Sequence, residues 1–330
     1  MELATAGGLG EGWLRRWSRR AISIPSVAAA WVAALALTPL AFGAWALGAG
    51  AWAQVALFAA VFLSHEMAGL CASAWLWLTG RAGDEAAHVR LRRWWACQLF
   101  RAAARIFALE LEIEGETAPG PGPVIVLIRH VSLADTLLPE VVLGARHGLR
   151  LRYVLKRELL ADPCLDVVGQ RLRCAFIRRG SGDSERELAA IRDLASDLGP
   201  GDGVLIYPEG TRFTPEKRGR ALARIESSGQ AERLTRARAL RHVLPPRTAG
   251  ALALLDAAPG ADVLWFAHTG FEGLATVRDV LSRGLGGRRI RVRIWRTQNS
   301  VIPAGRDARV RWLDAEWARV DGWIAGARAG

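Results

Sequence analysis

Apolar and polar positions divide the chain into two parts of different character. No acidic or basic residue other than histidine occurs from Ala21 to His65, and the apolar stretch from Val27 to about Gly50 exceeds the roughly 20 residues that a helix needs to cross a bilayer. A second apolar run, Ala51 to Leu78, is interrupted by His65 and Glu66. The second run fits a tilted span, a re-entrant hairpin arm or an interfacial helix, and we predict that the two runs form a membrane hairpin.

Arginine clusters flank this predicted hairpin. Arg15, Arg16, Arg19 and Arg20 precede it, and Arg81, Arg90, Arg92 and Arg93 follow it. Because positively charged flanks stay in the cytoplasm, we predict a bacterial inner-membrane protein whose following domain faces the cytoplasm. Export is the alternative, since Ala51-Trp52-Ala53 is similar to a signal-peptidase site. The first apolar stretch is, however, longer than the roughly 7 to 15 residues of a signal-peptide core.

The segment after the hairpin has the pattern of an amphipathic helix. From Arg90 to Leu109, apolar side chains alternate with arginines, which fits either a helix on a lipid surface or a helix that faces a protein core. A Pro- and Gly-rich series at residues 118–123 then ends regular structure. We predict two parts: residues 1–85, which contain a basic segment and the membrane hairpin, and a domain at residues 86–330.

Beyond residue 123, short β-branched runs alternate with longer helical patterns. The predicted strands are Val124–Ile128, Leu151–Leu155, Cys174–Arg178, Val204–Tyr207, Val263–Ala267 and Ile290–Trp295. The predicted helices are Ser132–Ala145, Ser184–Asp197, Pro215–Ser228, Thr248–Ala257 and Asp307–Ala325. This alternation predicts an α/β fold, with a mostly parallel sheet flanked by helices and preceded by the hairpin.

Charge and composition narrow the functional classes. The net charge of +12 comes almost wholly from arginine and indicates a polyanionic partner, either nucleic acid or an anionic membrane surface. Many of the arginines flank the apolar runs and no nucleic-acid-binding module is present, which favours the membrane. The four cysteines and six histidines show no disulfide framework or metal-ligand spacing, so we expect reduced cysteines and no metal.

The first candidate for chemistry is an H-x-x-x-x-D motif formed by His130 and Asp135 at the end of an apolar strand. Ligands of open α/β sheets bind at this end of the strands. A carboxylate bonded to one imidazole nitrogen fixes the tautomer and leaves the other nitrogen as a general base. Taken alone, an accidental pair at this spacing is the commoner explanation.

Three further blocks contain charged residues near strand ends. Glu209, Gly210, Thr211 and Arg212 follow one apolar strand, Arg178 and Arg179 end another, and Pro246 and Arg247 precede an apolar helix. Gly210 permits a tight loop whose amides, with Arg212, can hold a phosphate. Each block alone also fits a plain structural role: a strand-ending turn, a surface arginine pair or a proline-led helix start.

Together the four blocks resemble the motifs of glycerolipid acyltransferases of the lysophosphatidic acid type, over roughly residues 110 to 270. The E-G-T-R block is the most specific of them. Two departures concern the fine geometry: Arg129 stands where the family commonly has asparagine, and Leu172 or Arg173 replaces a usual glycine.

The resemblance implies that His130 is the catalytic base and Asp135 its partner. It implies that Arg179, Glu209, Gly210, Thr211 and Arg212 bind the acceptor's phosphate, and that Pro246 and Arg247 lie in the acyl-donor region. The expected reaction transfers an acyl group from acyl-CoA or acyl carrier protein to lysophosphatidic acid, without a cofactor. Other lysolipid acceptors are the alternative: lysophosphatidylinositol, lysocardiolipin or lyso-ornithine lipid.

Two rival interpretations remain. Ser132 suggests an acyl-serine intermediate in a Ser-His-Asp arrangement, although no nucleophile elbow precedes it. A rival of another class is a basic, membrane-surface binding protein without catalysis, which requires His130 and Glu209 to be incidental.

Overall fold

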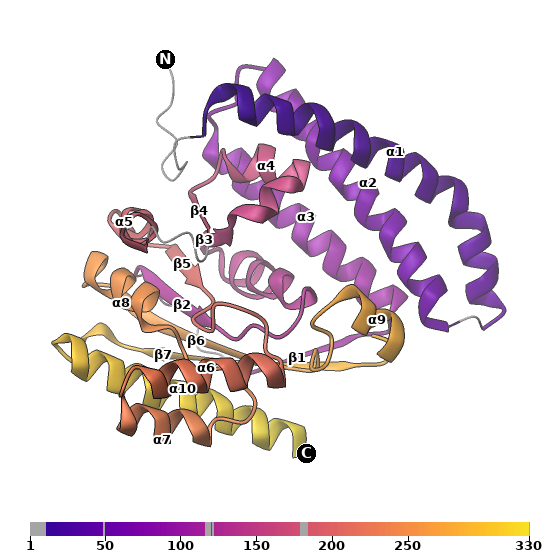
Figure 1. The fold of residues 1–330 in the computed structure, drawn as a ribbon. Helices are drawn as coiled ribbons and strands as arrows, with labels where there is room; N and C mark the ends of the chain where they lie inside the picture. The colour runs from indigo at the N-terminus through magenta and orange to yellow at the C-terminus, as the bar shows by residue number, and fades with distance from the viewer. Residues whose placement is uncertain (1–10, 49, 116–119, 121, 179–183, 330) are drawn as a thin grey trace. The chain divides into compact units, whose positions relative to one another are not determined.

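The structure is a computed structural model that describes residues 11–48, 50–115, 120, 122–178 and 184–329. It divides into two compact units. The N-terminal unit comprises Met1–Leu109 and Leu137–Leu194, and the C-terminal unit comprises Glu110–Thr136 and Ala195–Gly330. Figure 1 labels their helices and strands. The predicted boundary between residues 85 and 86 stays a prediction.

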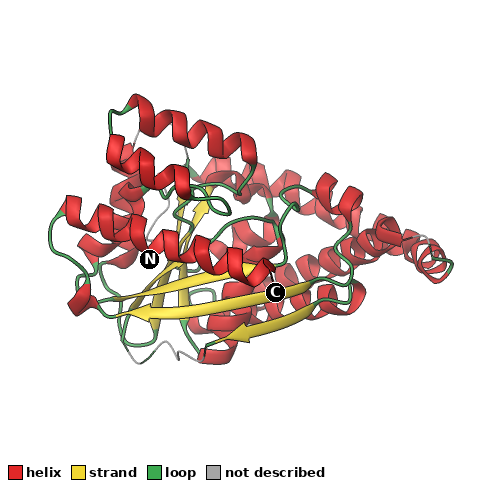
Figure 2. Ribbon diagram, turned by 90° about the horizontal axis from the view of Figure 1, so that it is seen from below, coloured by secondary structure: helices red, strands yellow, loops and turns green. Residues whose placement is uncertain are grey.

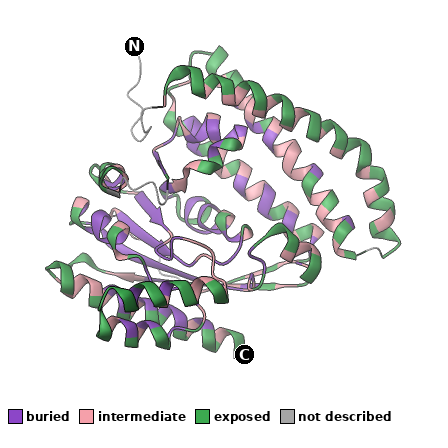
Figure 3. Cartoon of the chain, viewed as in Figure 1, coloured by how far each residue is buried: buried purple, intermediate pink, exposed green. Residues whose placement is uncertain are grey.

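The N-terminal unit is built on three long helices, α1 (Trp13–Ala46), α2 (Gly50–Leu78) and α3 (Glu85–Ile106). Helices α1 and α2 are long and apolar enough to cross a membrane. No described residue of α1 is buried, as Figure 3 shows along its length. Asp84 begins α3 by accepting a hydrogen bond from the amide of Ala87 at 2.8 Å, which satisfies one free amide of the first turn.

Helix α2 is covered by α3 along one face. The residues that α2 buries are mostly small (Ala53, Ala60, Gly69 and Ser73, with Glu66), which lets its neighbours approach closely. Gln54 near the start of α2 donates to the carbonyl of Ile106 at the end of α3. Arg171 bonds both Ser73 and His88, which links the opposite ends of these helices. Helices α2 and α3 therefore lie antiparallel over most of their length.

The apolar side of α3 faces the protein. Its buried residues are Ala87, His88, Val89, Ala96, Leu99, Phe100 and Ala103. The buried side agrees with the interpretation of residues 90–109 as a core-facing helix, and contact of the exposed side with a lipid surface stays a prediction. Beyond α3, the N-terminal unit contains the parallel strands β3 (Arg150–Lys156) and β4 (Cys174–Ile177) with the helices α4 (Pro163–Gly169) and α5 (Ser184–Ala195).

The C-terminal unit contains a mixed sheet in the order β1-β7-β6-β2-β5. Its strands are β1 (Glu110–Glu114), β2 (Val124–Ile128), β5 (Asp202–Ile206), β6 (Asp262–Thr269) and β7 (Arg289–Thr297). Only the β6–β7 pair is antiparallel. Strands β2, β5 and β6 are buried throughout, as expected where helices cover both faces. The mostly parallel α/β fold is confirmed.

The helices of this unit are α6 (Pro215–Ser227), α7 (Ala231–Ala239), α8 (Thr248–Ala257), α9 (Val277–Arg283) and α10 (Arg306–Ala329). Figure 2 shows α10, which ends at the C-terminal label, beside the strands. Its Trp317 is fully buried next to Trp265 of β6 and donates to the carbonyl of Leu244 at 3.0 Å. Helix α10 thus holds the loop that precedes α8.

The prediction of one helix over residues 132–145 is wrong. The chain there forms a short 3₁₀ turn, Ala134–Leu137, and one π-helical turn, Glu140–Ala145. The Asp135 carboxylate accepts hydrogen bonds from the amides of Val131 and Ser132, which draws the chain into a tight loop in place of a first helical turn.

Candidate active site

His130 and Asp135 meet just beyond the end of β2. Nδ1 of His130 lies 3.0 Å from Oδ1 of Asp135, while Oδ2 accepts hydrogen bonds from the amides of Val131 and Ser132 at 2.6 and 2.7 Å. Asp135 is fully buried, whereas the His130 side chain is 13% exposed. Because a carboxylate accepts at Nδ1, that nitrogen carries the proton, and Nε2 is left with a lone pair.

The environment of Asp135 keeps it ionised. Burial alone would raise its pKa, but the nearby His130 ring and the amide hydrogen bonds outweigh burial and hold the pKa below its usual value. The Tyr207 ring lies against the imidazole, with 4.4 Å between the ring centroids. The backbone carbonyl of His130 accepts a hydrogen bond from Phe213 at 2.9 Å. The imidazole is therefore held in one orientation from several sides.

Glu209 connects three loops of the site. Its Oε1 accepts a hydrogen bond from the amide of His130 at 2.7 Å, and its Oε2 accepts one from the amide of Leu244 at 2.8 Å. The residue is 2% exposed, and burial raises its pKa to about 8, against the opposing effect of the two amides and Arg129. Although the resemblance groups Glu209 with phosphate ligands, both of its oxygens are occupied by loop amides here.

Cationic side chains surround the turn at Gly210. The glycine has φ of +73°, and a Cβ added to it would lie 2.8 Å from Cδ of Arg247. Arg212 donates to the carbonyl of Ala275, and its own carbonyl accepts a hydrogen bond from Lys217 at 3.1 Å. Burial and the neighbouring arginines lower the pKa of Lys217. Arg212, Lys217 and Arg247, which we call the cationic cluster, therefore gather at one loop beside the His130 turn.

The remaining predicted site residues fall in different places. Thr211 lies in the loop beside Gly210, partly exposed. Pro246 is buried, and its carbonyl accepts a hydrogen bond from Arg233 at 2.7 Å, so it shapes the start of α8. Arg179 lies outside the described residues. Arg178, directly before it, belongs to the N-terminal unit.

An ion pair that the sequence did not reveal, between a buried arginine and a partly exposed glutamate, lies next to His130. Arg129 is 1% exposed and binds Glu272 at 2.5 Å, together with the carbonyls of His268 at 2.6 Å and His242 at 2.9 Å. Burial would raise the pKa of Glu272, but Arg129 outweighs it and lowers the pKa to about 2. These contacts join segments more than 100 residues apart, so no local pattern indicates them.

His268 is fully buried and lies close to both Arg129 and Asp135. Its Nε2 lies 3.0 Å from the backbone carbonyl of Arg129 and 3.7 Å from Oδ2 of Asp135. Since a carbonyl only accepts hydrogen bonds, Nε2 carries the proton. Burial is the largest cause of the lowered pKa of His268, which favours the neutral ring. Arg129 and His268 thus bond to each other's backbone, which fixes the residue that precedes His130.

Ser132 does not face the imidazole as a nucleophile would. The residue is 1% exposed, and its hydroxyl donates to the carbonyl of Leu274 at 2.8 Å while accepting from the amide of Ala134 at 3.2 Å. This geometry argues against the acyl-serine rival.

The arrangement defines a class of site: a histidine whose Nδ1 is bonded to a buried carboxylate, at the end of a parallel strand and beside a cationic loop. Residues 110–255 match the family model described as Acyltransferase. A curated relative, the Lyso-ornithine lipid O-acyltransferase of Pseudomonas aeruginosa, is 33% identical over 170 residues, which are 49% of this chain and 60% of that protein. Residues 110–255 of this chain are therefore similar to proteins of the acyltransferase family.

The aligned part of this chain corresponds to 60% of the length of that relative. Among solved structures, the 1-acyl-sn-glycerophosphate (LPA) acyltransferase PlsC from Thermotoga maritima aligns with a TM-score of 0.49 and 16% identity, over 75% of this chain and 83% of that one.

Proposed function

We propose that this protein transfers a fatty acyl group from an acyl thioester to the free hydroxyl of a lysophospholipid, converting lysophosphatidic acid to phosphatidic acid. The observation that carries the proposal is the bond between His130 and Asp135, which leaves Nε2 of His130 as a base at the end of β2. Acyl-CoA or acyl carrier protein is the proposed donor, and the proposed reaction uses no cofactor.

The chemistry follows from the tautomer. Nε2 of His130 removes the proton of the acceptor hydroxyl as its oxygen attacks the thioester carbonyl carbon. The resulting tetrahedral species collapses, the carbon–sulfur bond breaks, and the thiolate takes the proton back from the imidazolium. Asp135 stabilises the imidazolium between these steps, and its buried position strengthens this effect.

The cationic cluster is the proposed site for the acceptor's phosphate. Arg212 and Arg247 lie at the turn made by Gly210, and a phosphate there would be positioned beside the base. A bound phosphate would hold the acceptor hydroxyl in position for attack on the thioester. Such positioning of two reactants can provide a large part of an enzyme's rate enhancement. Thr211 and the amide groups of the loop complete the proposed phosphate site.

A second acceptor class is favoured by the sequence relative, which is named for lyso-ornithine lipid. Ornithine has a carboxylate that the same cluster can bind. An acyl-transfer assay on the purified chain, with lysophosphatidic acid and lyso-ornithine lipid as acceptors and acyl-CoA and acyl carrier protein as donors, distinguishes the two. Product formed only from lyso-ornithine lipid would overturn the phosphate acceptor, and no product with any pair would overturn catalysis.

Arg212→Ala should raise the KM for the acceptor and leave the KM for the donor nearly unchanged. Loss of a charge-assisted hydrogen bond to phosphate costs about 1.5 to 3 kcal/mol, or roughly 10- to 150-fold. Arg238→Ala is the matched control, because its side chain is exposed on α7 and pairs only with exposed Glu226. An unchanged acceptor KM in Arg212→Ala would remove Arg212 from the site.

For its location, we propose the bacterial inner membrane with the catalytic domain in the cytoplasm. Helix α1 exposes apolar side chains along its length, including Val32, Leu37 and Leu40, whereas α2 is partly covered by α3. The lipid-facing surface is therefore mainly that of α1. A reporter fused after Gly330 should be active in the cytoplasm; periplasmic activity would reverse the proposed orientation.

A further inference from the structure

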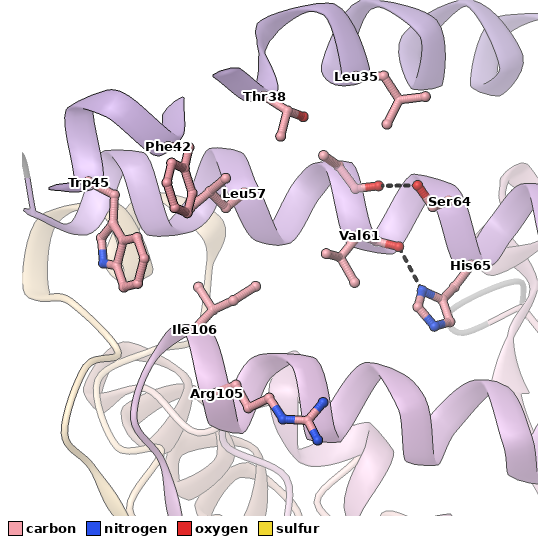
Figure 4. A pocket seen from close by; sticks show the side chains of 11 residues that line it. Leu35, Thr38, Phe42, Trp45, Leu57, Val61, Ser64, His65, Arg105 and Ile106 are labelled. Carbon is pink, nitrogen blue, oxygen red and sulfur yellow. Dashed lines mark hydrogen bonds between the residues drawn. The ribbon is translucent and has the colours of Figure 1, made fainter. Parts of the chain in front are cut away.

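A cavity that includes no residue of the His130 site lies within the N-terminal unit. Helices α1, α2 and α3 line an open space of about 450 Å³, within the range of roughly 300 to 1,000 Å³ typical of small-molecule sites (Figure 4). Most of the lining is apolar: Leu35, Phe42, Trp45, Leu57, Val61 and Ile106. The cavity has the character of a site for a hydrocarbon chain.

Its polar atoms are few. The Ser64 hydroxyl donates to the carbonyl of Ala60 and accepts from Trp31, so its hydrogen bonds are already made. Nδ1 of His65 lies 2.8 Å from the carbonyl of Val61 and must therefore donate, which leaves Nε2 able to accept a hydrogen bond. In Figure 4 the His65 ring points away from α2 toward α3. This side of the cavity can accept a hydroxyl group.

A positive charge lies on the same lining. Arg105 of α3 is exposed, and within the described part of the chain no carboxylate pairs with it. Arg101 precedes it by one helical turn on the same face, and it also has no acidic partner among the described residues. Exposed cations beside an apolar cavity favour a ligand that has both a hydrocarbon chain and an anionic group.

We propose that this cavity binds one anionic phospholipid of the membrane, separately from the catalytic site. One acyl chain occupies the space lined by Leu35, Leu57 and Val61, and the phosphate pairs with Arg105. A hydroxyl of the headgroup donates to Nε2 of His65. The proposed lipid lies between α1, α2 and α3, and the proposal does not depend on which lipid the protein acylates.

Native mass spectrometry of the purified full chain tests the proposal. The His130→Ala variant serves as the host, so that no lipid is consumed, and the probes are phosphatidylglycerol and phosphatidylcholine of equal chain length in a neutral detergent. We expect one phosphatidylglycerol per chain and at least tenfold weaker retention of phosphatidylcholine. Equal retention of the two lipids would overturn the proposal.

Three substitutions in this host localise the lipid. Arg105→Gln should weaken phosphatidylglycerol binding about tenfold or more, the effect of one charge-assisted hydrogen bond. Val61→Phe should reduce binding of both lipids by filling the cavity. Arg90→Gln is the control, because it removes an equal charge from an exposed position at the other end of α3, and its binding should match that of the host.

Unchanged phosphatidylglycerol binding in Arg105→Gln, or an equal loss in Arg90→Gln, would contradict the site. A dimeric mass that Val61→Phe converts to a monomer would place a second copy of the chain in the cavity and would also overturn the proposal. The binding measurement requires no acyl transfer. A negative result in the transferase assay would therefore not affect the result of the binding measurement.

Discussion

Substitution of His130 by alanine should abolish measurable acyl transfer while the protein stays folded. Positioned general bases typically contribute about 10² to 10⁴-fold to a rate. The imidazole is partly exposed, and its ring packs on Tyr207 and bonds to Asp135, so its loss should cost little stability. The measurement is kcat at saturating donor and acceptor, together with a thermal unfolding curve.

Two neighbouring substitutions serve as controls for this result. Asp135→Asn should be severely impaired, because an amide stabilises imidazolium poorly and can select the wrong tautomer. Ser132→Ala should keep much of the activity and lose about 1 to 3 kcal/mol of stability, since it leaves the carbonyl of Leu274 without its buried donor. An inactive Ser132→Ala, together with an acyl adduct on Ser132 after incubation with donor alone, would instead establish the covalent mechanism.

Arg129→Met should cause the largest loss of stability, about 2 to 5 kcal/mol, because buried acceptors are left unsatisfied. The carbonyls of His268 and His242 lose their donor, and the partly exposed Glu272 carboxylate loses its cation. Unfolding by urea in detergent measures the change. Arg238→Met, which breaks an exposed pair with Glu226, should cost at most about 1 kcal/mol. Equal effects of the two substitutions would contradict a structural role for Arg129.

The same pair predicts a dependence on pH. The pKa of Glu272 is lowered from its usual 4.5 to about 2 in the folded protein. A lowered folded pKa stabilises the protein above the usual value, and this contribution is lost as pH falls through about 4.5 to 2. Arg129→Met should remove this part of the acid sensitivity, and the double substitution Arg129→Met with Glu272→Gln should recover part of the lost stability.

Much of the fold could be predicted because its signals are local. Strand β2 is a continuous apolar run, and β5 and β6 each contain one. The predicted helices α6 and α8 begin at Pro215 and Thr248. Strand β1 was missed because its alternation of glutamate with Leu111 and Ile113 is short and half exposed. Helix α4, only seven residues long, has too few turns to show a period.

The candidate site could be predicted only in part, for a physical reason. His130, Asp135 and the loop at Gly210 are identified by spacing within short motifs. The contacts among Arg129, His268 and Glu272 depend on which strands become neighbours, because β2 pairs with β6. The departure at Arg129 was visible in the sequence, but its carboxylate partner lies 143 positions away.

The close packing of α2 on α3 also limits how this protein can be shortened. Removal of residues 1–84 would delete the Asp84 cap of α3 and the rings of Phe58 and Phe62 that pack on Phe107 and Trp95. The shortened chain should therefore aggregate. Helices α1 and α2 thus support the packing of α3. A preparation without detergent requires polar substitutions on the exposed surface of α1 instead of removal of the two helices.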